Sequence, residues 1–123
     1  MDNLQKNIDD AFESASKKYN IDENLLRAVA QTEYGGDINA RSKSGAIGLM
    51  QFMPATAKSY NIDPRDPVQS IHGAAALLND NLNHFGNVNK ALKAYNNGWD
   101  ESKWNNNETE QYDKKVLNNL NTI

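Results

Sequence analysis

The sequence predicts a mostly helical α+β fold, and three observations support this prediction. Apolar residues recur at helical spacing along most of the 123-residue chain, which is the pattern of helices with one buried face. Most of these runs follow a residue that can cap a helix and stop near a glycine. Residues 37–48 lack this pattern and are small and polar, so we expect a loop or a small β-hairpin near residues 37–52. The length fits one domain over residues 1–123.

The first half of the chain contains three expected helices. Asp22 is a suitable cap for the second helix, and Gly35-Gly36 are expected to end it. Pro54 suits the first turn of a short third helix that runs to about Tyr60. The first helix is indicated by apolar residues at helical spacing, namely Leu4, Ile8, Ala11, Phe12, Ala15 and Tyr19.

The second half of the chain contains three more expected helices. Asp66-Pro67-Val68-Gln69 combines a cap, a proline in the first turn and a glutamine three residues on, and Gly86 is expected to end the helix that follows. Asn87 can cap the next helix, which Gly98 ends. Asn107-Glu108-Thr109-Glu110 has the pattern of a capping box before a last amphipathic helix.

Composition excludes several classes of function. The net charge of −3 argues against a nucleic-acid binder, which would usually be basic. The chain has no cysteine, and His72 and His84 are twelve residues apart on one expected helix, so we expect neither a metal site nor a cofactor. The apolar runs are too short for stable membrane insertion. Residues 1–6 lack an apolar signal region, which indicates export by another route, a virion-associated protein or a piece of a larger exported protein.

Glu33 is the acidic residue that stands out as a candidate catalytic group. It lies four residues after Val29 and eight after Leu25, so it shares the apolar face of its helix. Burial there would raise the pKa of its carboxyl group, as a general acid near neutral pH requires. The alternative is a structural carboxylate that faces solvent or pairs with Arg27 or Arg41.

Three ordered motifs surround this residue. Ser42 to Ala57 reads S-K-S-G-A-I-G-L-M-Q-F-M-P-A-T-A, residues 94–98 read A-Y-N-N-G, and residues 108–112 read E-T-E-Q-Y. With Glu33 at its interval before Ser42, this set resembles the soluble lytic transglycosylase family, which shares its fold with goose-type lysozyme. The resemblance covers about residues 20–117. It departs from the family at Tyr34, where serine is usual, at Ser70 for asparagine and at Ala74 for glycine.

The resemblance implies a lysozyme-like fold and a role for each matching residue. Glu33 would be the acid and base, and Ser42 would lie near it and the N-acetyl group of the substrate. Tyr95 would point at the reacting sugar, and Glu108 would contact a saccharide further along. Gln51 and Met53 would line the cleft, and Thr56 would lie close by.

Each of these binding residues also has a structural interpretation. Ser42 could satisfy a turn and Gln51 could hold a loop together. Met53 could belong to the core. Tyr95 could be a core aromatic with a bonded hydroxyl, and Glu108 a helix-terminal charge. Two tryptophans, Trp99 and Trp104, could stack on sugar rings or pack in the protein.

The activity implied by the resemblance is cleavage of peptidoglycan glycan strands without water, leaving 1,6-anhydro ends. We expect a monomer acting at the bacterial cell wall, similar to enzymes carried by phage particles or conjugation systems. One alternative is a hydrolase on the same fold, with Asp37 as a second acid that holds a water. Another is a non-catalytic glycan-binding module, which would not need an acid at Glu33.

Overall fold

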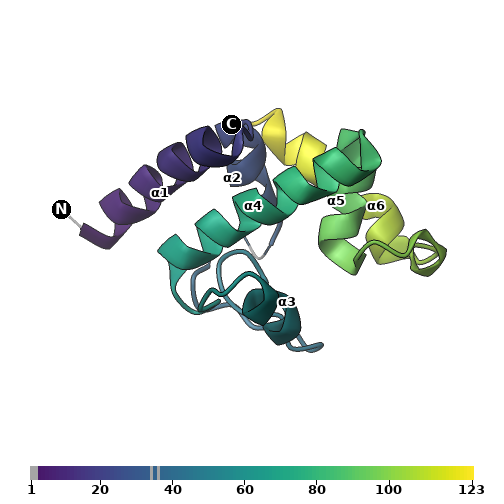
Figure 1. The fold of residues 1–123 in the computed structure, drawn as a ribbon, viewed down its shortest axis with the longest axis horizontal. Helices are drawn as coiled ribbons and strands as arrows, with labels where there is room; N and C mark the ends of the chain where they lie inside the picture. Colours follow the sequence, from purple (N-terminus) through teal and green to yellow (C-terminus); the bar gives the residue numbers. More distant parts are fainter. Residues whose placement is uncertain (1–2, 34, 36) are drawn as a thin grey trace.

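The structure, a computed structural model, describes residues 3–33, 35 and 37–123. All six expected helices are present in this part of the chain (Figure 1). In chain order the elements are α1 (Asn3–Tyr19), α2 (Glu23–Thr32), α3 (Pro54–Ser59), α4 (Pro67–Phe85), α5 (Val88–Asn97), the short 3₁₀ helix η2 (Glu101–Lys103) and α6 (Asn107–Leu120). No helix in these ranges is both long and apolar enough to cross a membrane.

Helix α4 runs through the middle of the molecule and packs against α1, α2 and α5 (Figure 1). Helix α6 packs against α2 and α5, so the last helix of the chain lies beside the second. Helix α3 and the loops around it lie together on one side of α4. The apolar faces predicted from the sequence meet in one core, whose largest fully buried side chains include Leu26, Met50, Ile71, Leu78 and Leu92.

Capping side chains fix where the helices begin. Asp22 accepts hydrogen bonds from the backbone N–H groups of Asn24 and Leu25, and Asp66 does the same at the start of α4. The capping box expected at Asn107 is wrong by one residue. The cap of α6 is Asn106, whose backbone is extended and whose side chain accepts from the N–H of Thr109.

Helix α2 ends earlier than its glycines suggest. Its last helical residue is Thr32, and Glu33 already leaves helical geometry with φ −86° and ψ 83°. The N–H of Glu33 still donates to the Val29 carbonyl, so the residue stays attached to the helix end. Gly35 has a positive φ of 65°, whereas Tyr34 and Gly36 lie outside the described residues.

The segment expected to be a loop or hairpin is a loop with two isolated antiparallel bridges. Ile47 pairs with Arg41 on one side and with Phe52 on the other. Gly48 allows this fold because its φ is +80° and a Cβ atom there would lie 2.2 Å from the carbonyl oxygen of Pro64. The loop is therefore pressed against the segment that leads into α4.

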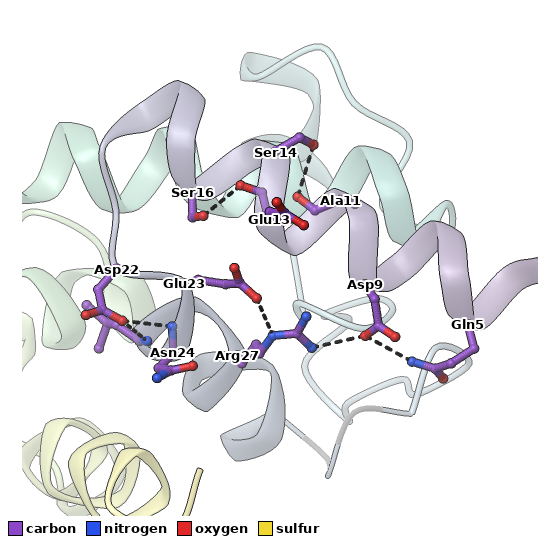
Figure 2. A network of polar contacts seen from close by, with 11 residues as sticks. Gln5, Asp9, Ala11, Glu13, Ser14, Ser16, Asp22, Glu23, Asn24 and Arg27 are labelled. Atoms are coloured by element: carbon purple, nitrogen blue, oxygen red, sulfur yellow. Dashed lines mark hydrogen bonds and ion pairs between the residues drawn. The ribbon is translucent and has the colours of Figure 1, made fainter.

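An ion-pair network between α1 and α2 is centred on Arg27 (Figure 2). Its guanidinium group bonds Asp9 of α1 at 3.1 Å and Glu23 of α2 at 3.0 Å, and it lies over the ring of Phe12. Arg27 thus joins the first two helices. The ion pair that it was considered to form with Glu33 is absent from the described residues.

Candidate active site

A single cleft of about 790 Å³ brings the sequence-predicted site residues together. Its walls come from the end of α2, the loop before α3, α3 itself, α4 through Leu77, α5, the turn after α5, and α6. All seven candidates line it, namely Glu33, Ser42, Gln51, Met53, Thr56, Tyr95 and Glu108. Residues up to 75 positions apart in the sequence, from Glu33 to Glu108, thereby face one space.

Glu33 is held in this cleft by α6. The hydroxyl of Tyr112 donates a hydrogen bond to Glu33 Oε2 at 2.7 Å. Next to it, Asn119 of α6 donates to the hydroxyl of Thr32, which itself bonds the Ala28 carbonyl. Two hydrogen bonds from α6 therefore fix the end of α2 and the position of the Glu33 carboxylate.

The surroundings of Glu33 change its acidity. Burial raises the pKa of its carboxyl group to about 7, while the hydrogen bond from Tyr112 lowers it and the negative charge of Glu108 raises it. Because burial is the largest effect, the carboxyl group can both give and accept a proton near neutral pH. Burial also raises the pKa of Tyr112 and Tyr95 well above the usual value, so both phenols stay neutral donors.

Tyr95 joins this group through its ring and its hydroxyl. Its ring stacks on that of Tyr112, with centroids 6.4 Å apart and planes 13° apart. Its hydroxyl donates to the carbonyl of Met50 at 2.7 Å. The hydroxyl expected to point at the sugar is therefore bonded to the loop before α3, while Tyr95 is also one of the residues that line the cleft.

Gln51 holds the loop that forms one wall of the cleft. Its backbone has a positive φ of 53°, and its Nε2 donates to the carbonyls of Ala40 and Gly48. This is the loop-clamping role considered as an alternative. Its Oε1 is buried and has no hydrogen-bond partner in the described part of the chain.

The other candidates from this part of the chain differ in how firmly they are held. Ser42 Oγ accepts from the N–H of Ala46 and bonds Ser44 Oγ at 3.1 Å, so it satisfies a turn and also lines the cleft. Met53 is 43% exposed, so the interpretation as a core residue is wrong. Thr56 faces the cleft from α3.

Glu108 lies in the first turn of α6, on the same helix face as Tyr112 four residues later. It is exposed, and its Oε2 accepts a long hydrogen bond of 3.4 Å from Asn96 Nδ2. Asn96 in turn accepts from the buried hydroxyl of Thr109. The A-Y-N-N-G and E-T-E-Q-Y motifs are thus joined by side-chain hydrogen bonds between α5 and α6.

The proposed second acid is not in the cleft. Asp37 is exposed, and its Oδ1 accepts from the N–H of Asn39, as expected for a residue that caps a turn. Of the described residues that line the cleft, only Glu33 and Glu108 carry carboxyl groups.

No group of His, Cys, Asp and Glu side chains in the described ranges could hold a metal ion. The two histidines have separate surroundings. His72 bonds Ser14 of α1 at 3.3 Å, and His84 stacks on Trp99.

Comparison with known proteins decides the family. The family model described as the transglycosylase SLT domain matches residues 10–118. The chain belongs to this family. The match reaches further toward the N-terminus than the range 20–117 expected from the motifs, and so takes in part of α1.

Curated relatives of this SLT domain include phage and bacterial proteins. It is 46% identical over 111 residues to the transglycosylase of Enterobacteria phage PRD1, an alignment that covers 89% of this chain and 42% of the relative. It is 35% identical over 127 residues to the peptidoglycan transglycosylase of Escherichia phage T7, covering 93% of this chain and 10% of the relative. The membrane-bound lytic murein transglycosylase F of Cellvibrio japonicus is 33% identical over 97 residues, covering 72% and 20%. The chain therefore spans less than half the length of each of these relatives.

A solved structure shows the same fold. An inactive mutant of the lytic transglycosylase Slt from Pseudomonas aeruginosa matches with a TM-score of 0.75 and 24% identity, over 89% of this chain and 22% of that one. The predicted mostly helical, lysozyme-like fold is confirmed.

Tyr112 is a site residue to which the sequence interpretation gave no role. In the sequence it is the last residue of the E-T-E-Q-Y motif and nothing more. A signal was present, because a residue four positions after Glu108 shares its helix face. What the sequence did not reveal is that this face meets the end of α2.

Proposed function

We propose that this SLT domain cleaves the β-1,4 bond between N-acetylmuramic acid and N-acetylglucosamine in peptidoglycan, without consuming water. The observation that carries this proposal is the partly buried Glu33 carboxyl group in the cleft, which accepts a hydrogen bond from Tyr112; burial raises its pKa to about 7. The names of the relatives, transglycosylase and peptidoglycan transglycosylase, support the same substrate.

The reaction needs one group that first gives and then takes a proton. Protonated Glu33 donates its proton to the bridging oxygen as the bond from muramic C1 to that oxygen breaks. The N-acetyl group of the substrate supports the electron-poor C1. Glu33, now a carboxylate, accepts the proton of the muramic C6 hydroxyl as its oxygen bonds C1. The products are a 1,6-anhydromuramic end and a free N-acetylglucosamine hydroxyl, and Glu33 is protonated again. General acid–base catalysis of this kind contributes roughly 10²- to 10⁴-fold in rate.

The other cleft residues take supporting roles in this proposal. Ser42 lies near the N-acetyl group, and Glu108 contacts a saccharide further along the strand. Tyr95 and Gln51 shape the loop that faces the reacting sugar, since both bond backbone carbonyls of that loop. Met53 and Thr56 contribute wall surface.

We further propose that the domain works as a monomer at the bacterial cell wall, either on a phage particle or within a larger exported protein. Two of the relatives are phage proteins.

The experiment that tests the activity is digestion of purified peptidoglycan in ¹⁸O-labelled water, followed by mass spectrometry of the released muropeptides. Unlabelled anhydro ends, each lighter by one water than a hydrolysed end, are the expected product. Labelled, reducible muramic ends would identify a muramidase on the same fold. Wall binding without cleavage would instead identify a glycan-binding module.

A further inference from the structure

The turn after α5 carries a tryptophan that the proposed reaction does not use. Trp99 is 50% exposed and lines the cleft, whereas Trp104, five residues later, is buried. Of the large apolar side chains that are exposed among the described residues, only Trp99 and Met53 line the cleft. Its place in the cleft wall puts it beside the same bound glycan strand that Glu33 would cut.

Hydrogen bonds hold Trp99 in one position. Its Nε1 donates at 2.7 Å to Oδ1 of Asn81, a fully buried residue of α4. The Nδ2 of Asn81 donates in turn to the Ala91 carbonyl. The preceding Gly98 has φ +84° and ψ −177°, a region that is essentially limited to glycine. The indole N–H of Trp104 donates to the Gly98 carbonyl, so the turn is fixed on both sides.

One face of the indole is already covered. The His84 ring is stacked on it, with centroids 3.9 Å and planes 11° apart, and Phe85 meets it edge-on. The exposure that remains must therefore lie on the opposite face and the ring edges. The result is a flat, apolar, rigid surface that is open on one side.

Such a surface suits the face of a sugar ring. A pyranose presents C–H bonds on one face and hydroxyl groups around its edge. An indole ring can cover the C–H face while the indole N–H keeps its hydrogen bond to the protein. The polar side chains of Asn96, Asn97 and Glu108 line the same cleft and are available to contact the edge.

We infer that Trp99 is a saccharide-stacking platform that binds one N-acetylhexosamine ring of the glycan strand at a subsite away from the cleaved bond. This inference rests on the proposed function for the identity of the strand. A rigid platform binds without the ordering cost that a mobile side chain would incur. Because the contact does not involve reacting atoms, it should stabilise substrate and transition state alike.

The test measures binding of N-acetylglucosamine oligomers by calorimetry to proteins that all carry Glu33→Gln, so that cleavage plays no part. Adding Trp99→Ala should weaken binding about tenfold, as expected for loss of an aromatic contact of about 1.4 kcal/mol. Trp99→Phe keeps a ring and should weaken binding less. Val88→Ala removes an exposed apolar group that does not line the cleft and should leave binding unchanged.

Tryptophan fluorescence gives a second measurement, made on the protein that keeps Trp99 and compared with Trp99→Ala. The oligomers should shift its emission to shorter wavelength and shield it from acrylamide, while the buried Trp104 remaining in Trp99→Ala should show neither change. In cleavage of soluble glycan strands, Trp99→Ala should raise KM with little change in kcat.

Unchanged affinity in Trp99→Ala together with unshielded emission would refute the platform, even if anhydro products confirm the reaction. Binding that requires peptide stems, with no response to peptide-free oligomers, would also refute it. Trp99-dependent oligomer binding by a protein that yields no anhydro product would keep the platform and reject the proposed reaction.

Discussion

Replacing Glu33 with glutamine should remove activity and, at high pH, make the protein more stable. Glutamine has nearly the same shape and can still accept the hydrogen bond from Tyr112, but it cannot carry charge. Burial raises the pKa of the wild-type carboxyl group to about 7 in the folded protein, against an ordinary value of 4.5. Its proton is therefore held more tightly in the folded state than in the unfolded one.

The sign and size of the effect follow from this difference. A raised folded-state pKa contributes stability that is fully present below pH 4.5 and is lost as the pH rises through 7, because burying the charged form is unfavourable. A shift of about 2.5 units corresponds to about 3 kcal/mol at 1.36 kcal/mol per unit. Relative to wild type, Glu33→Gln should thus gain about 3 kcal/mol between about pH 4 and pH 8, or roughly 10 °C in Tm.

The assay is chemical and thermal denaturation of both proteins across this pH range, with wall-clearing activity measured on the same samples. Glu110→Gln is the matched control, because Glu110 lies on α6, is exposed and does not line the cleft. It should show neither the gain in stability nor the loss of activity. A stability difference between Glu33→Gln and wild type that does not change with pH would refute the buried, proton-holding carboxyl group. Retention of more than a small part of the activity would refute its catalytic role.

Three further results are expected. Tyr112→Phe removes a hydrogen bond that lowers the pKa of Glu33, so the alkaline limb of the activity profile should move up by about one pH unit, given roughly 1.5–3 kcal/mol for a bond to a charged group; an unmoved limb would contradict this. Ser42→Ala and Tyr95→Phe should each lower activity per folded molecule several-fold, while the free energy of unfolding falls by no more than about 1 kcal/mol. A sharp fall in melting temperature with full specific activity would show that their roles are structural. Chelators should leave the activity unchanged, and loss in EDTA that one added metal restores would overturn the expectation of metal-free chemistry.

Local signals explain which parts of the fold the sequence could predict. The caps at Asp22 and Asp66 and the stop at Gly86 act within one helical turn, so their residue types indicate the boundaries directly. Before α6 the sequence has three consecutive asparagines at residues 105–107, any of which can cap a helix, and the glutamate three residues on favours Asn107. Only the backbone geometry shows that Asn106, and not Asn107, is the cap.

The site was predictable as a set of residues but not as a set of contacts. The motifs placed the seven candidates in one cleft, as the structure has them. The bonds from Tyr112 to Glu33 and from Tyr95 to Met50 join residues 79 and 45 positions apart. Such contacts depend on how α2, α5 and α6 pack, and one sequence contains no local pattern for that packing.

The contact between the end of α2 and α6 makes this active site depend on the last part of the chain. Glu33 lies in the first third of the sequence, yet Tyr112 and Asn119, which secure it, belong to the final helix. A chain still being synthesised therefore has its acid before it has the groups that set its acidity and position. If the domain has the proposed activity, that activity should appear only once α6 has docked against α2. An agent that loosened α6 from outside should then abolish the activity without entering the cleft.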